Sequence, residues 1–145
     1  MKYKLLNNDT QKTYAVILDS GEEAINCMQK FANNKRLNAA HFTAIGAFSK
    51  VTLGFFDFSI KDYRKTILTE QLEVLSLMGD IARYNEEVKT HAHVVVGKRD
   101  TSAHGGHLIE GIAHPTLEII IMESPAYLER KMDDATGIPL ISINE

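Results

Sequence analysis

Histidine is the residue type whose spacing in this chain most clearly indicates chemistry. Of six histidines, four lie within the 17 residues from 91 to 107. His91 and His93 flank a single residue in a β-like segment, and side chains at i and i+2 leave a strand on the same face, roughly 7 Å apart at the backbone. His107 follows Gly105-Gly106, where the chain can turn tightly and return a loop beside that strand. The three imidazoles could therefore reach one ion.

Three neutral imidazoles are a ligand set that suits zinc and other first-row divalent ions. Three protein ligands leave a further position open for water or a small-molecule ligand. The spacing thus predicts a metal site, with zinc as its ion, at His91, His93 and His107. The alternative is that these histidines are surface or core residues that local hydrogen bonds satisfy.

The remaining histidines are not expected to bind the ion, and two of them, His41 and His114, have no partner at metal-ligand spacing. His104 precedes the two glycines in a polar loop, so we expect it in solvent or at the rim of a pocket. His41 alternates within an apolar segment and His114 precedes Pro115, and we expect both to be structural.

A carboxylate could orient a ligand histidine or act as a general acid or base beside a bound ion. Asp100, Glu110 and Glu118 are close to the histidines in sequence, and Glu73 lies in another predicted strand. Glu118 and Glu73 are the catalytic candidates because each interrupts an apolar strand. An ion pair or an outward-facing strand position would explain Glu118 as well.

Charge and motif content argue against other functional classes. Sixteen Lys and Arg against nineteen Asp and Glu give a net charge of −3, and the basic residues are scattered, so electrostatics gives no reason to expect nucleic acid. The sequence has no Walker loop, no GxGxxG and no GxSxG, so nucleotide binding and serine hydrolase chemistry have no support. The single cysteine, Cys27, cannot form an internal disulfide and is expected to be a small buried hydrophobe.

We expect one domain over residues 1–145. A chain of 145 residues that is 44% apolar has room for a sizeable core, and no repeat or linker divides it. Its longest apolar stretches are far shorter than the roughly 20 residues of a membrane helix. No apolar run near the N-terminus suits a secretory signal, so the expected location is cytoplasmic.

Hydrophobic periodicity predicts mostly strands around the histidines. Ser20 and Glu23 predict a capping box for a helix whose apolar stripe begins at Ala24 and ends near Asn33-Asn34. A short second helix is predicted at 125–132. The segments with strand-like patterns are 12–18, 39–46, 50–58, 63–68, 71–81, 90–97 and 117–122.

Several predicted strands are apolar on both faces, as at residues 94–96 and 119–121. One long helix and one short helix cannot cover both faces of six or more strands. A partner subunit is therefore expected to cover one face, in an interface that could include Phe55, Phe56 and Phe58.

A series of short motifs runs in order through nearly the whole chain. They are Gly46-Ala47, VTLG at 51–54 with Asp57, LEVLSL at 72–77 with Gly79 and Ile81, HAH at 91–93 with Gly97 and Asp100, GGHL at 105–108 with Gly111, TLE at 116–118, Arg130, Asp133 and Thr136-Gly137. Each is weak singly, but in this order they are specific. The chain resembles the PPC (plants and prokaryotes conserved) domain in its stand-alone prokaryotic form.

This resemblance implies an α+β fold with a mainly antiparallel, strongly curved β-sheet flanked by helices, assembled as a homotrimer. It also implies metal-ligand roles for His91, His93 and His107, as in prokaryotic members. Family members are commonly described as candidate DNA-binding proteins, because plant relatives fuse the domain to an AT-hook that enters the minor groove. This chain has no AT-hook, and its segment 70–75 lacks the Gly and Arg of the plant GRFEIL-like stretch. DNA binding is therefore not expected.

The implied fold is also similar to that of acetolactate decarboxylase and of a group of metal-dependent ester hydrolases, which hold zinc with three histidines. Two hypotheses follow. The first is a metal-binding homotrimer that acts in DNA-associated or protein-interaction work. The second is a metal-dependent small-molecule enzyme, of hydrolase or decarboxylase type, in which Glu118 or Glu73 is the acid or base.

Overall fold

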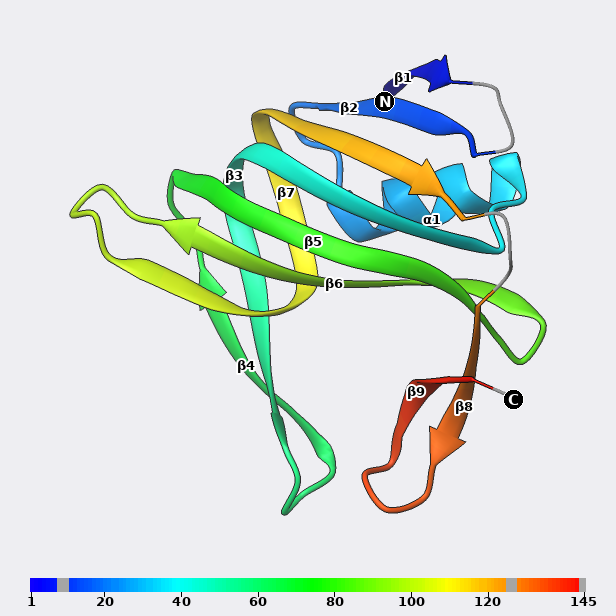
Figure 1. Cartoon of the computed structure of the whole chain (residues 1–145). Coiled ribbons are helices and arrows are strands. Elements are labelled where there is room, and N and C mark those ends of the chain that lie inside the picture. Colours follow the sequence, from blue (N-terminus) through cyan, green and yellow to red (C-terminus); the bar gives the residue numbers. More distant parts are fainter. Residues whose placement is uncertain (8–10, 125–127, 144–145) are drawn as a thin grey trace.

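The computed structural model describes residues 1–7, 11–124 and 128–143. Within these residues the chain forms one helix and nine strands (Figure 1). In chain order they are β1 (Lys2–Asn7), β2 (Thr13–Asp19), α1 (Ala24–Lys35), β3 (Ala39–Asp57), β4 (Asp62–Leu68), β5 (Leu72–Tyr84), β6 (Glu87–Gly97), β7 (Ala103–Glu123), β8 (Glu129–Asp133) and β9 (Ile138–Ser142).

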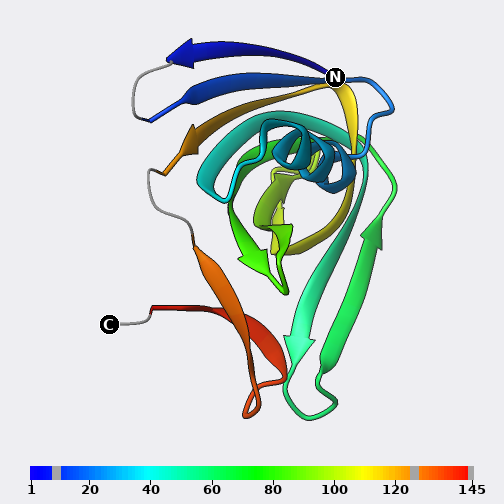
Figure 2. The same cartoon turned by 90° about the vertical axis from the view of Figure 1, so that its right-hand side faces the viewer.

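The strands form one curved, nine-stranded sheet in which β3 and β7 are the long central strands. All described neighbours are antiparallel except β5 and β8, which meet in parallel at Arg83 and Glu129. Figure 2 shows α1 lying inside the curve of β3. The predicted α+β fold with a mainly antiparallel, curved sheet is confirmed, but a single described helix accompanies the sheet.

A bend in β3 joins two segments that the sequence predicted as separate strands. The register against β5 and β7 shifts around Gly46, as it does at β-bulges, which bend a strand and increase its twist. Gly46 has φ 144°, and a Cβ there would lie 2.4 Å from the carbonyl oxygen of Thr116. Only glycine fits this close approach of two backbones, so the curvature depends on it.

The helix begins at Ala24 with Glu23 as its N-cap, whose carboxylate accepts from the backbone N–H groups of Ile25 and Asn26. The predicted capping box with Ser20 is wrong, because Ser20 instead hydrogen-bonds Nδ1 of His114 at 2.8 Å. The intervening Gly21 and Glu22 exchange backbone hydrogen bonds with Ala113 of β7, so they cannot form a helical turn. His114 is structural, as expected.

The prediction of a second helix at 125–132 is wrong for the part of this range that the structure describes. Residues 125–127 lie outside the described residues, and residues 129–132 belong to β8, which pairs with β9. The pairing with β9 satisfies the backbone of β8, and this long-range partner was not visible in the local pattern. The β8–β9 and β3–β4 hairpins extend to the same side of the molecule (Figures 1 and 2), where Lys61 Nζ donates to the carbonyl oxygen of Asp134 at 3.4 Å.

The strands that are apolar on both faces bury only one face within the chain. Val94 and Val96 are buried in the core with Phe31 of α1, whereas Val95 points outward and is exposed. Ile120 is likewise exposed between buried neighbours in β7. Among the described residues, no helix is both long and apolar enough to cross a membrane.

Candidate metal centre

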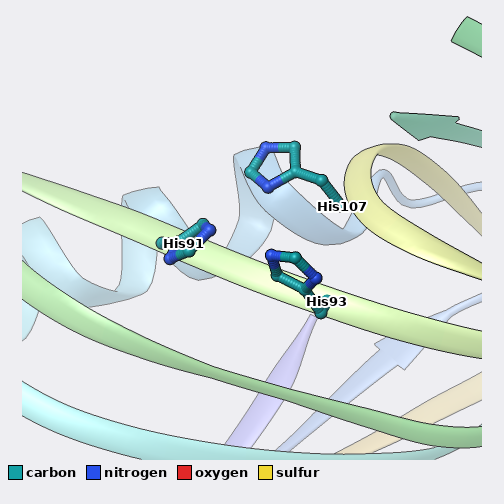
Figure 3. Close-up of side chains that lie close together, drawn as sticks. All are labelled: His91, His93 and His107. Carbon is teal, nitrogen blue, oxygen red and sulfur yellow. The ribbon is translucent and has the colours of Figure 1, made fainter. Parts of the chain in front are cut away.

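The three predicted ligands lie together on two adjacent strands. His91 and His93 are on β6, and His107 on β7 is the direct cross-strand partner of His93. One ring nitrogen from each residue lies within 4.8 Å of the others, and the ring centroids are 5.0 to 5.4 Å apart. Figure 3 shows the three rings grouped around a common space. Donors this close can share one ion.

The chain returns to this cluster by a route that differs from the prediction. The turn lies at residues 98–102, where the N–H of Lys98 donates to Ser102 and the N–H of Thr101 donates to Lys98. Gly105 and Gly106 lie inside β7, paired with residues of β6. A Cβ at Gly106 would approach the carbonyl oxygen of Gly54 to 2.8 Å. The glycine therefore permits close strand packing and does not form the turn.

The electrostatics of the cluster favour neutral imidazoles. Burial, and then the charges of His91 and His93, lower the pKa of His107 from 6.5 to about 4. Loss of hydration, and then the charge of His91, lower the pKa of His93. Neutral imidazole is the form that binds a metal ion.

An unpartnered nitrogen also fits a metal ion. His107 Nδ1 is buried and has no hydrogen-bond partner among the described residues. A buried polar atom without a partner is rare in folded proteins. Three imidazole donors, one of them unpartnered, fit a zinc-type ion better than a calcium or magnesium ion, which prefer oxygen.

A carboxylate and a guanidinium that the sequence analysis did not single out for the site support His91. Asp80 on β5 is the cross-strand partner of His91, and its Oδ2 lies 3.7 Å from His91 Nδ1. Arg130 donates from one nitrogen to both carboxylate oxygens of Asp80 at 2.7 Å, and this nitrogen lies 3.2 Å from His91 Nδ1. Nδ1 of His91 thus faces Asp80 and Arg130, which leaves Nε2 for a metal ion. Carboxylates beside a ligand histidine orient its ring in this way.

The charge of Asp80 is maintained by its partners. Burial favours the protonated carboxyl, but hydrogen bonds from His91 and Arg130 outweigh it and lower the pKa of Asp80. Arg130 is itself buried, with 8% of its side chain exposed, and it also donates to the carbonyl oxygen of Pro139 at 3.0 Å. Arg130 therefore links the three-histidine cluster to the β8–β9 hairpin. The motif series contained Arg130, but only the tertiary structure shows its partner.

A cavity of about 400 Å³ lies against the cluster, with His91 and His107 in its wall. Tyr63 of β4 stacks on His107, with centroids 4.6 Å apart and rings inclined by 23°. Burial raises the pKa of Tyr63, so its hydroxyl stays protonated. The lining also includes Ile138, Pro139 and Leu140 of β9.

The two carboxylates predicted as catalytic lie elsewhere in the chain. Glu73 and Glu118 are exposed and line a different cavity, of about 580 Å³, whose lining includes none of the three histidines. Glu73 is paired with Gly97, four residues beyond His93. Glu110 forms an ion pair with Lys50 at 2.7 Å, and Asp100 accepts from Ser102 within the turn.

The other histidines lie outside the three-histidine cluster. His104 pairs with Val96 at the far end of the β6–β7 hairpin, and His41 is exposed on β3. Cys27 is half-buried, with its Sγ 3.9 Å from Glu22. Burial raises the pKa of its thiol.

Comparison with known proteins decides the family. Residues 6–125 match the Plants and Prokaryotes Conserved (PCC) domain, also abbreviated PPC. The chain belongs to this family. No curated protein matches the sequence.

Three solved structures share the whole fold. A metal-containing protein from Archaeoglobus fulgidus is 30% identical, with a TM-score of 0.84 over 98% of this chain and 97% of its own. A PPC protein from Pyrococcus horikoshii is 27% identical, with a TM-score of 0.86 over 99% and 96%. A protein from Bacteroides thetaiotaomicron, described as a candidate DNA-binding protein, is 26% identical, with a TM-score of 0.87 over 97% and 96%.

A more distant likeness extends beyond the PPC family. A Staphylococcus aureus protein of unknown function, described as similar to alpha-acetolactate decarboxylase, is 10% identical with a TM-score of 0.58. The match covers 83% of this chain and 53% of that one, so it concerns the fold alone. The predicted similarity to the acetolactate decarboxylase-like fold is confirmed.

Proposed function

We propose that this PPC-domain protein holds one divalent ion, zinc, with His91, His93 and His107, and that it works as a homotrimer. The observation that carries the proposal is the group of three imidazole donors within 4.8 Å on adjacent strands. The lowered pKa values of His93 and His107 support it, because they keep both rings in the metal-binding form at neutral pH. The relative from Archaeoglobus fulgidus is described as metal-containing.

The homotrimer is supported by the outward face of the sheet. Large apolar side chains are exposed there on four neighbouring strands, namely Ile45, Leu75, Met78, Val95 and Ile120. Exposed apolar patches of this kind mark contact surfaces. Phe55 on β3 and Phe58, which directly follows β3, are also exposed and could take part in such an interface.

A second candidate function is a metal-dependent small-molecule enzyme, which the cavity beside His91 and His107 favours. A bound divalent ion supplies Lewis acidity for a carbonyl or a water molecule. The residues of the chain would orient His91 through Asp80 and shield His107 through Tyr63. Among the described residues of one chain, the carboxylate of Asp80 lies beside His91, whereas Glu73 and Glu118 line a different cavity.

We do not propose DNA binding, although some relatives are described as candidates for it. The net charge is −3, and the basic residues are scattered along the sequence. A protein that binds DNA through its phosphates needs several Lys and Arg together to neutralise them.

Elemental analysis after zinc reloading tests the proposed metal site. The wild type, His93→Ala and His104→Ala are stripped of metal, reloaded with zinc and desalted. We expect one zinc per chain in the wild type and in His104→Ala, which changes a histidine outside the cluster, and none in His93→Ala. Equal loading of all three proteins would show that the cluster is not the site. Circular dichroism of His93→Ala shows whether the ion is structural, since a variant that loses both metal and fold contradicts an open position.

A further inference from the structure

The cavity beside the histidine cluster is lined by two chemically different sets of residues. His91 and His107 also belong to the proposed metal site. The β9 residues Ile138, Pro139 and Leu140 form the apolar part of the lining. A volume of about 400 Å³ is in the lower part of the range for small-molecule sites, roughly 300–1,000 Å³. The cavity therefore fits a small molecule and is too small for a folded partner.

The cavity wall is held in place by the same contacts that orient the metal ligand. Arg130 donates to the carbonyl oxygen of Pro139 on β9 and to both oxygens of Asp80, which faces His91. Tyr63, which also lines the cavity, stacks on His107. The hydrogen bonds of Arg130 thus connect the apolar residues of β9 with the carboxylate beside His91.

The charge of the lining favours an anion. The described residues that line the cavity include two cations, Lys89 and Arg130, and no carboxylate. The charge of Arg130 is balanced by Asp80, which lies behind the wall. Lys89 lies 2.7 Å from Glu87 in an exposed pair, which is weakly held and can exchange its partner. Three neutral imidazoles would leave the charge of a divalent ion uncompensated, which also favours a negative ligand.

We propose that this cavity binds a small monocarboxylate with a short branched or aromatic side group. The carboxylate lies toward His91 and His107, and the apolar group packs against Leu140 and its neighbours on β9. This inference rests on the proposed metal site and names the class of ligand that the site takes.

Titration calorimetry of the zinc-loaded protein with phenylacetate, acetate and phenylacetamide tests the proposal. We expect phenylacetate to bind at least tenfold more tightly than either acetate, which lacks the apolar group, or phenylacetamide, which lacks the charge. Equal affinity for all three, or no binding of phenylacetate to protein that holds one zinc per chain, would overturn the ligand assignment while the metal site stands. A chain that takes up no zinc would overturn both.

A matched pair of β9 variants locates the binding. Leu140 lines the cavity and is 43% exposed, whereas Ile141 is 40% exposed and is absent from the lining. We expect Leu140→Asn to weaken phenylacetate binding roughly five- to tenfold and to leave zinc content and acetate affinity unchanged. Ile141→Asn should bind phenylacetate like the wild type. Equal effects of the two substitutions would place phenylacetate elsewhere and overturn the proposal.

Discussion

His93 and His107 are direct cross-strand partners in the β6–β7 hairpin, with their ring centroids 5.4 Å apart. Their backbones are joined by the ladder of an antiparallel pair, and the two rings leave the sheet on the same face. His91 lies two residues before His93 on that face. All three imidazoles therefore depend on one hairpin, which brings them together without an ion.

The first prediction concerns the acid stability of the metal-free protein. The folded pKa of His107 is about 4, against about 6.5 in an unfolded chain. Between these values the unfolded chain binds a proton that the folded chain does not. The contribution of His107 to the free energy of unfolding is therefore complete above pH 6.5 and is lost as the pH falls through 4. We expect a loss of about 1–3 kcal/mol, reduced by the partial exposure of the ring.

Urea denaturation at about pH 7 and about pH 4.5 measures this loss. His107→Asn should lose less stability between the two pH values than the wild type, whereas His104→Ala should behave like the wild type. If the wild type and His107→Asn lost the same free energy of unfolding between the two pH values, groups other than His107 would cause the acid sensitivity.

The second prediction is that Asp80 tunes the metal affinity through His91. Asp80→Asn removes the charge opposite His91 Nδ1, and loss of such a partner typically lowers metal affinity 10- to 100-fold. Competition with a zinc chelator gives the affinity. Asp134→Asn is the control, because this carboxylate is exposed in the β8–β9 turn. An unchanged affinity in Asp80→Asn would show that Asp80 serves only to balance Arg130.

The third prediction is a trimer that depends on the outward face of the sheet. Sedimentation equilibrium at micromolar concentration should give three times the chain mass of 16.2 kDa. Ile45→Glu places a charge among the exposed apolar residues of that face and should give a monomer. Ile143→Glu, at an isoleucine near the C-terminus that is 75% exposed against 61% for Ile45, should stay trimeric. A monomeric wild type would refute the assembly.

The fourth prediction is that duplex DNA binds weakly or not at all. Proteins that bind through phosphates lose affinity steeply with salt, and this chain has a net charge of −3. Fluorescence anisotropy with AT-rich duplexes across a salt series measures the binding. Trimer formation could gather scattered Lys and Arg on one surface. Sub-micromolar affinity for the duplex at physiological salt would contradict the prediction and indicate such a surface.

Local sequence patterns were sufficient where the physical cause is local. The period of two in a strand places His91 and His93 on one face, and the apolar stripe of α1 predicts its buried residues Met28 and Phe31. The alternation of buried and exposed residues likewise predicted most of the strands. The helix start was displaced to Ala24, because pairing of Gly21 and Glu22 with β7 competes with the helix.

The tertiary structure alone decided which distant residues meet. Strand register places Asp80 opposite His91 and Glu73 opposite Gly97, and register is a property of two paired strands that neither sequence segment contains. The buried ion pair of Arg130 with Asp80 likewise depends on where the β8–β9 hairpin packs. The sequence by itself thus determined the three metal-ligand candidates and the sheet-rich fold. Long-range pairing decided that Asp80 faces His91, that Glu73 and Glu118 lie away from the histidines, and that a cavity lies beside the cluster. The energy of this pairing comes from contacts between segments far apart in the chain.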